Sequence, residues 1–347
     1  MTTENDASEP LMADPFSSGG APEEPLMADP FSSNAGAAEV EGGAAIGAEL
    51  ARLGEKYPRV VLVAADLGDS PLGSAFIRRF PDRFFDFGIA ETNSMSAAAG
   101  MAASGLVPYV VQMAAFGAMK CAEQIRTDMA ATRMPVRIIS AWSGLMMGYF
   151  GTSHHAVEDI AIARAITGLT IVAPSDGNSM RALLWSTVEH PGPVFFRVGT
   201  GEERPVHADV PLIERGRFVR LREGSDMTII ATGVGVQAAV RAAAILAEEG
   251  IETVVYDALY LKPLDDAAVV DAARTTGRIL TVEEHKPIGG LTSAVGEVLL
   301  RHGLKVDLAS VTLPDEDLVV APPRELLKHY GITHDGVADR ARELMSR

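Results

Sequence analysis

The sequence predicts an α/β protein of two domains, each built on a mostly parallel sheet that helices cover. Apolar strand-like runs alternate with amphipathic helical runs from about residue 41 onward, which is the pattern of parallel α/β folds. Several runs, such as residues 59–67, are almost wholly apolar, as expected for strands buried on both faces. A polar connection over residues 202–214 divides the series. We therefore expect a larger domain over 41–208 and a smaller one over 209–347.

The composition supports two domains and limits the classes of partner. The chain has 347 residues, of which 47% are hydrophobic, and its net charge of −16 disfavours nucleic acid and anionic membranes as partners. Cys121 is the single cysteine, so no disulfide framework can form. No apolar run reaches the roughly 18 residues of a membrane span, and the first residues do not have the pattern of a signal peptide. We expect a cytoplasmic location.

The first forty residues differ in composition from the rest. The decapeptide EPLMADPFSS occurs at residues 9–18 and again at 24–33, among Gly, Ala, Ser, Pro and acidic residues. Such a segment buries too little apolar surface to offset the entropy of ordering it, so we predict a disordered tail over 1–40. The duplication is either neutral or a doubled docking peptide, which would raise the effective concentration at a partner.

In the first domain, predicted strands and helices alternate along the chain. Apolar runs predict strands over 59–67, 105–113, 135–142, 169–176 and 192–199. Amphipathic runs predict helices over 44–57, 117–132, 155–166 and 179–190, and a run of small residues after Glu91 predicts one more.

The second domain repeats the alternation on a smaller scale. Strands are predicted over 226–232, 252–261, 278–285 and 305–313, and helices over 237–250, 265–275, 291–303, 323–331 and 334–347. Gly233 and Gly235 follow the first of these strands, but a third glycine and an acidic ribose ligand are lacking, so tight strand–helix packing is the favoured interpretation over dinucleotide binding. The polar segment 282–291 is interpreted as a structural or interface turn, with a ligand loop as the alternative.

Glu91 is the most informative single residue. It stands at the head of a helix whose other residues are mostly small and apolar. A carboxylate there could simply complement the helix dipole. However, a buried carboxylate needs a hydrogen-bond partner or it takes up a proton, and groups kept in such places often serve a site. We therefore interpret Glu91 as a residue that holds a specific ligand.

Two other features follow predicted strands, where open α/β sheets bind ligands. One is the turn 64–71, and the other is the loop that ends in His154 and His155. Adjacent histidines diverge in most backbones, and no cysteine or spaced carboxylate accompanies them, so no metal site is predicted. A helix-capping turn around Ser153 with a surface histidine is the structural alternative.

Two motifs carry a resemblance to a known family. Residues 87–105, FGIAETNSMSAAAGMAASG, and 152–176, TSHHAVEDIAIARAITGLTIVAPSD, resemble the glutamate and histidine motifs in the C-terminal half of transketolase. The resemblance extends over about 42–340 and is nearest in style to split transketolases. 1-Deoxyxylulose-5-phosphate synthases and the β subunits of 2-oxoacid dehydrogenases share the architecture. It implies a pyrimidine-binding domain, a transketolase C-terminal domain and thiamine diphosphate as cofactor.

The resemblance assigns roles at the cofactor. Glu91 would hydrogen-bond N1′ of the aminopyrimidine and so control protonation during catalysis, because the cofactor supplies the chemistry and the protein the geometry. Phe116 would stack on the pyrimidine, and Met113 and Met119 would line the same pocket. Asp66 belongs to a turn that touches the cofactor.

Substrate contacts follow from the same resemblance. His154 would act at the substrate hydroxyls, Ser70 would contact a substrate phosphate, and Arg197 would bind a sugar phosphate. Phe150 stands where the family has an aspartate, and Trp142 where transketolase has a histidine. These two departures predict a less polar or unphosphorylated acceptor, as in specialised metabolism.

The family's Gly-Asp-Gly motif with a downstream Asn, which holds Mg²⁺ and the diphosphate, is not found in this sequence. We therefore expect a separate diphosphate-binding subunit and an α2β2 heterotetramer with two-fold symmetry. The predicted reaction is transfer of a two-carbon ketol unit from a ketose or ketose phosphate to an aldehyde or related acceptor. The alternatives are a β subunit of a 2-oxoacid decarboxylating or acyloin-forming complex, and a non-catalytic regulatory subunit.

Overall fold

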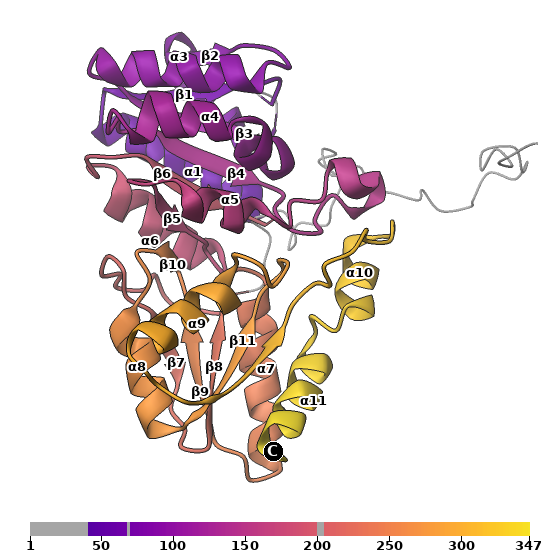
Figure 1. Ribbon diagram of the computed structural model, residues 1–347. Helices are drawn as coiled ribbons and strands as arrows, with labels where there is room; N and C mark the ends of the chain where they lie inside the picture. The colour runs from indigo at the N-terminus through magenta and orange to yellow at the C-terminus, as the bar shows by residue number, and fades with distance from the viewer. Residues whose placement is uncertain (1–40, 68–69, 200–204) are drawn as a thin grey trace, which may run out of the picture.

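The computed structural model describes residues 41–67, 70–199 and 205–347. It contains two α/β domains with mostly parallel sheets, which confirms the predicted fold class (Figure 1). The duplicated decapeptides lie outside the described residues. Among the described residues, no helix is both long and apolar enough to cross a bilayer.

Seven strands form the first sheet within the described part of the chain, in the order β10-β5-β6-β4-β3-β1-β2. Six of them pair in parallel, so their carboxyl ends meet at one edge, where the site residues follow. Most are fully buried, which explains their apolar sequences. Their bounds are β1 Val60–Ala64, β2 Phe84–Asp86, β3 Val107–Met113, β4 Arg137–Ala141, β5 Thr170–Val172 and β6 Val194–Arg197.

Helices cover both faces of this sheet. They are α1 Glu41–Lys56, α2 Ser74–Arg79, α3 Glu91–Ala103, α4 Ala122–Gln124, α5 Asp159–Ala165 and α6 Gly177–Thr187, with short 3-10 segments η1 Pro81–Arg83 and η4 Gly148–Ser153. The helix predicted over 117–132 is not regular. It consists of π-helical η2 Phe116–Lys120, then α4, then π-helical η3 Ile125–Ala130. π-Helical turns often occur at functional sites, and η2 begins at one predicted cofactor residue.

The second sheet has the strand order β12-β11-β8-β9-β7 over the described residues, and only its edge strand β7 is antiparallel. Gly235 begins α7, where a Cβ atom would lie 3.0 Å from Val282 Cγ1, which fits tight packing rather than a nucleotide loop. The strands are β7 Val219–Arg222, β8 Met227–Ala231, β9 Thr253–Asp257, β11 Arg278–Val282 and β12 Asp307–Val311. The helices are α7 Gly235–Glu248, α8 Asp266–Thr275, α9 Leu291–Arg301, α10 Pro323–His329 and α11 His334–Met345.

The prediction of one continuous strand over 252–261 is wrong. The structure divides it into β9 and β10 Tyr260–Lys262, and β10 crosses to pair antiparallel with β5 of the first sheet. The division follows Asp257, whose buried carboxylate accepts hydrogen bonds from Ser175 Oγ and His207 Nε2. The pattern of apolar residues does not show that β10 belongs to the other sheet, because β10 is as apolar as β9.

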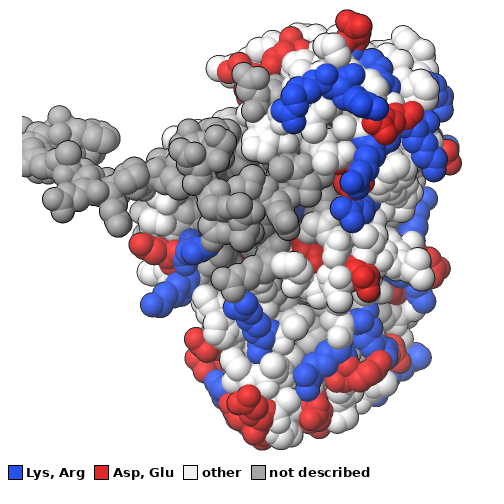
Figure 2. Space-filling model, turned by 180° about the vertical axis from the view of Figure 1, so that it is seen from behind, with Lys and Arg blue, Asp and Glu red and all other residues white. Residues whose placement is uncertain are grey.

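The two domains share apolar contacts as well as this strand. One cluster of buried side chains joins Val63 and Met95 of the first domain to Ile230 and Leu291 of the second. On the face seen in Figure 2, acidic and basic side chains are interspersed over the described surface.

Candidate active site

Glu91 is the first residue of α3, and its position follows from the packing of that helix. Its buried residues recur every three or four positions, and they are Glu91, Ser94, Met95, Ala98, Ala99 and Ala102. Gln112, near the end of β3, donates from Nε2 to Ser94 Oγ at 2.6 Å and to the Glu91 carbonyl oxygen at 3.1 Å. The neighbouring strand therefore fixes the first turn of α3 and with it the carboxylate.

Glu91 is 6% exposed, and its carboxylate has an ionic partner that lies 29 positions away in the sequence. Lys120, the last residue of η2, donates from Nζ to Glu91 Oε2 at 2.6 Å. Burial by itself raises the pKa of Glu91, but the hydrogen bond and charge of Lys120, with a backbone hydrogen bond, bring that pKa below its usual value. The hydrogen bond to Glu91 in turn raises the pKa of Lys120. The pair is therefore ionised at neutral pH.

An aromatic cluster continues from this ion pair. The Lys120 ammonium lies 6.0 Å from the centroid of the Phe116 ring, and that ring meets the His154 ring edge-on at 5.3 Å. The Phe150 ring also contacts His154, with the two centroids 4.8 Å apart. Ser153 Oγ lies 2.9 Å from His154 Nδ1. The structure therefore brings together Glu91, Phe116, Phe150 and His154, with Lys120 as the link.

His155 is buried, unlike its neighbour His154. It is 6% exposed, and its Nε2 has no hydrogen-bond partner among the described residues. Burial lowers the pKa of His155, so the ring is neutral at pH 7. Within the described ranges, no group of three or more His, Cys, Asp or Glu side chains could hold a metal ion.

The ends of β1 and β4 carry two predicted site residues with unusual backbone angles. Asp66 has a φ of 60° and Trp142 a φ of 55°, values that non-glycine residues seldom adopt. Asp66 is exposed, whereas Trp142 is buried in the apolar core of the first domain. The Ser70 side chain is also buried, and its Oγ has no hydrogen-bond partner among the described residues.

Three other predicted residues do not lie in the aromatic cluster. Met113 is half-buried and packs against the core of the first domain, and Met119 is 58% exposed beside Lys120. Arg197 is buried, and its Nε donates to both carboxylate oxygens of Asp159, at 2.9 and 3.1 Å. Its Nη2 also donates to the carbonyl oxygens of Ala156, at 3.3 Å, and of Glu284 in the second domain, at 2.8 Å, so Arg197 lies at the domain junction.

Two adjacent glutamates at the end of β11, Glu283 and Glu284, each make structural hydrogen bonds to backbone N–H groups. Glu283 accepts from the backbone N–H groups of Leu291, at 2.6 Å, and Thr292, at 2.8 Å, and so caps α9. Glu284 reaches into the first domain and accepts from the Leu145 N–H at 2.8 Å. The structural interpretation of 282–291 fits these contacts. Two adjacent acids directly after a buried strand were the available signal.

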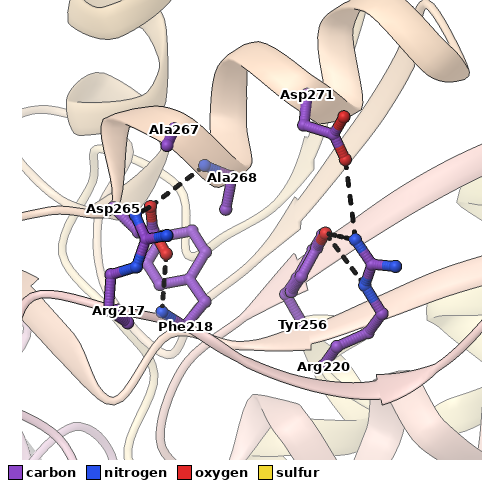
Figure 3. Close-up of a pocket in the computed structure, with 8 residues that line it drawn as sticks. All are labelled: Arg217, Phe218, Arg220, Tyr256, Asp265, Ala267, Ala268 and Asp271. Carbon is purple, nitrogen blue, oxygen red and sulfur yellow. Dashed lines mark hydrogen bonds and ion pairs between the residues drawn. The ribbon is translucent and has the colours of Figure 1, made fainter. Parts of the chain in front are cut away.

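A hollow of about 370 Å³ lies elsewhere, on the second domain (Figure 3). Its charged groups are paired with one another: Arg217 with Asp265 at 3.0 Å, and Arg220 with the Tyr256 hydroxyl and with Asp271. This hollow contains none of the predicted site residues. The buried carboxylate and the aromatic cluster of the first domain are the better candidate for chemistry.

Comparisons with known proteins agree with this geometry. The profile of the "Transketolase, pyrimidine binding domain" matches residues 38–204, and that of the "Transketolase, C-terminal domain" matches 216–337. The "Putative transketolase C-terminal section" of Methanocaldococcus jannaschii is 34% identical over 87% of this chain and 95% of its own length. One of the subunits of the apulose-4-phosphate transketolase of Phocaeicola vulgatus is 34% identical over 86% of this chain and 95% of its own length.

Longer relatives and solved structures extend the comparison. The 1-deoxy-D-xylulose-5-phosphate synthase of Desulforudis audaxviator is 38% identical, but the match spans 85% of this chain and only 47% of that protein. A solved structure titled "Split gene transketolase, inactive beta4 tetramer" superposes with a TM-score of 0.80 at 36% identity, and covers 87% of this chain and 97% of that one. The chain belongs to the transketolase family, with that family's pyrimidine-binding and C-terminal domains.

Proposed function

We propose that this chain is the C-terminal subunit of a split, thiamine-diphosphate-dependent transketolase. It transfers a two-carbon ketol unit from a ketose or ketose phosphate to an aldehyde or related acceptor. The observation that carries the proposal is the buried, ionised Glu91 at the head of α3, joined through Lys120 to the cluster that contains His154. The names of relatives that match nearly their full length support a separate subunit.

The residues present suit the cofactor. Ser70 Oγ and His155 Nε2 are buried polar atoms with no hydrogen-bond partner among the described residues, as expected where a ligand completes the site. When bound, thiamine diphosphate supplies the electron sink for carbon–carbon bond cleavage. Glu91, kept ionised by Lys120, would accept the hydrogen bond of a protonated N1′ and hold that proton in place. Phe116 would lie against the pyrimidine ring.

The remaining cofactor contacts are assigned to the surrounding residues. Asp66, at the exposed end of β1, would border the cofactor, and Met113 and Met119 would line the pocket around it. Mg²⁺ would be held by the partner subunit, since the sequence provides no Gly-Asp-Gly motif for it.

On the substrate side, His154 would contact hydroxyl groups of the sugar, while Phe150, which is 49% exposed, covers the His154 ring with an apolar face. Ser70 and Arg197 would face the phosphate end, and Trp142 fills a position that is polar in transketolase. Two aromatic residues in these places favour an acceptor that is less polar or lacks a phosphate. Steady-state rates with sugar phosphates and with unphosphorylated or aromatic aldehydes test this, and a strong preference for pentose phosphates would contradict it.

The surface around the site supports a partner chain. Ile89, two residues before Glu91, is 78% exposed, and Met119 is 58% exposed. Val320, which is 63% exposed, lies against Gly151, next to Phe150. Exposed apolar side chains grouped around a site are typical of protein interfaces. We propose that the diphosphate-binding subunit covers them and that two copies of each chain assemble.

The test is reconstitution with a separate chain that carries Gly-Asp-Gly and a downstream Asn. The expected result is ketol transfer by the pair and no turnover by either chain alone. Turnover by this chain alone would contradict the split-enzyme proposal. Activity of the pair with a 2-oxoacid donor only would identify a 2-oxoacid decarboxylating or acyloin-forming complex instead.

A further inference from the structure

The loop that carries Phe150 and His154 is closed at its base. Gly144 and Ala156 exchange two backbone hydrogen bonds, Gly144 N to Ala156 O at 3.0 Å and Ala156 N to Gly144 O at 2.9 Å. The eleven-residue loop between them carries Phe150 and His154, two of the residues assigned to the substrate side of the proposed site. The position of those side chains therefore depends on what holds this loop, residues 144–156, against the rest of the protein.

The second domain holds the base of the loop. Glu284 is 1% exposed, and its Oε1 accepts from the Leu145 N–H at 2.8 Å. A Cβ atom on Gly144 would lie 2.1 Å from Glu284 Oε2, so the carboxylate occupies the space that this glycine leaves. Lys286 N donates to Val157 O at 3.1 Å just beyond the other end of the loop. Both ends are thus fixed by residues of the short segment after β11.

The tip of the loop is also seated on the second domain. A Cβ atom on Gly148 would lie 2.4 Å from Leu326 Cδ1 and 2.5 Å from Ala321 O, and one on Gly151 would lie 2.9 Å from Val320 Cγ2. Figure 1 shows α10, which contains Leu326, beside the short helical segment of the loop. The backbone of the loop therefore packs directly on residues 320–326 of the second domain.

We propose that Glu284 of the second domain is a positioning residue. It holds loop 144–156 in place and thereby sets the positions of the His154 and Phe150 side chains. A carboxylate that accepts a buried backbone N–H forms a stronger hydrogen bond than a neutral acceptor. Its loss leaves a buried donor without a partner, so the base of the loop opens more often. The consequence for catalysis rests on the proposed function, but the effect on the loop does not.

Hydrogen exchange of the full-length chain tests the loop directly. In Glu284→Ala, amides of residues 144–156 should exchange about tenfold faster or more, and in Glu284→Gln, which keeps an acceptor of the same shape, the increase should be smaller. The matched control is Glu283→Ala, because Glu283 is equally buried but caps α9. That variant should expose the first turn of α9 and leave the loop unchanged.

Kinetics of the reconstituted pair test the consequence. Glu284→Ala should raise KM for the acceptor about tenfold or more, and should change the affinity for thiamine diphosphate less, because Glu91 and Phe116 do not belong to the loop. If Glu284→Ala does not fold, Glu284→Asp serves, since it keeps the charge but shortens the side chain that reaches the Leu145 N–H. Unchanged loop exchange in the folded variant, or equal exchange in the Glu283→Ala control, would overturn the proposal. An inactive wild-type pair would contradict the proposed function and leave the exchange result intact.

Discussion

Lys120 Nζ lies 2.6 Å from Glu91 Oε2, which joins the last residue of a π-helical turn to the first residue of α3. The carboxylate is almost wholly buried and the ammonium is half-exposed. A buried carboxyl group without this cation would tend to take up a proton. Lys120 thus determines the charge state in which Glu91 meets a ligand.

The first prediction concerns that charge state. Lys120→Met removes the cation that lowers the pKa of Glu91, so burial dominates and the pKa of the carboxyl rises. The acidic limb of the pH profile of kcat/KM should therefore move to higher pH, while Lys120→Arg should restore the wild-type limb. The profile is measured on the reconstituted pair, and an unmoved limb in Lys120→Met would show that the pair does not control Glu91.

The second prediction concerns the acceptor. Phe150→Asp places a carboxylate beside His154, so the preference should shift by about tenfold or more in kcat/KM toward polyhydroxylated acceptors, which a hydrogen-bonding group in the site discriminates. Competing polar and aromatic aldehydes in one reaction give the ratio directly. The control is Tyr149→Asp at the neighbouring, 38% exposed position, and an equal shift in both variants would indicate a general charge effect.

The third prediction concerns the stability of the first domain. Glu49 is buried and accepts from Arg181 Nε at 2.7 Å and from Trp185 Nε1 at 2.9 Å, which ties α1 to α6. Arg52 on the same helix also donates to Glu49, at 2.6 Å, and Glu49→Ala should lower the free energy of unfolding by about 2 kcal/mol, because it leaves all three donors without their acceptor. Glu55→Ala on the same helix removes only an exposed pair with Arg79, and should cost at most about 1 kcal/mol. Equal losses in urea unfolding would contradict this.

The fourth prediction concerns how the stability contributed by the buried Asp257–His207 pair depends on pH. Burial lowers the pKa of His207, but the hydrogen bond and charge of Asp257 raise it above its usual value. Burial raises the pKa of Asp257, and His207 and Ser175 only partly oppose this. Both groups therefore bind protons more tightly in the folded state, so their contribution is full at low pH and is lost as pH rises through the folded pKa of each.

Asp257→Asn removes this linkage. The difference in unfolding free energy between the wild type and the variant should be largest at the lowest pH at which both proteins fold, and it should decline by on the order of 1 kcal/mol as the pH rises toward about pH 9. Chemical unfolding at several pH values measures it. A difference that grows with pH would contradict the assignment.

The fold was predictable because local pattern and tertiary structure agree in most of the chain. Fully apolar runs became central parallel strands, and the small-residue face of α3 became its buried face. The crossing of β10 was not predictable, because Tyr260 and Lys262 pair with β5 through contacts distant in sequence. The irregular helix after Phe116 was likewise unforeseen, since π-helical turns have no periodic signature of their own.

The candidate site was predictable only in part. Glu91 was conspicuous because a charge in a small-residue helix is unusual, and the resemblance pointed to His154. Lys120 and Glu284 were not predicted, because each acts on a residue 29 or 139 positions away. The resemblance places Arg197 at a substrate phosphate, but its hydrogen bond to the Glu284 carbonyl oxygen could be known only from how the two domains meet.

The role of Glu91 is the central claim, and Glu91→Gln in the reconstituted pair tests it most directly. The amide keeps the size of the side chain but cannot hold the proton at N1′ as a carboxylate does. We predict that kcat falls by about 100-fold or more, while sedimentation shows that the pair still assembles. Turnover near the wild-type value in an assembled Glu91→Gln pair would contradict the account.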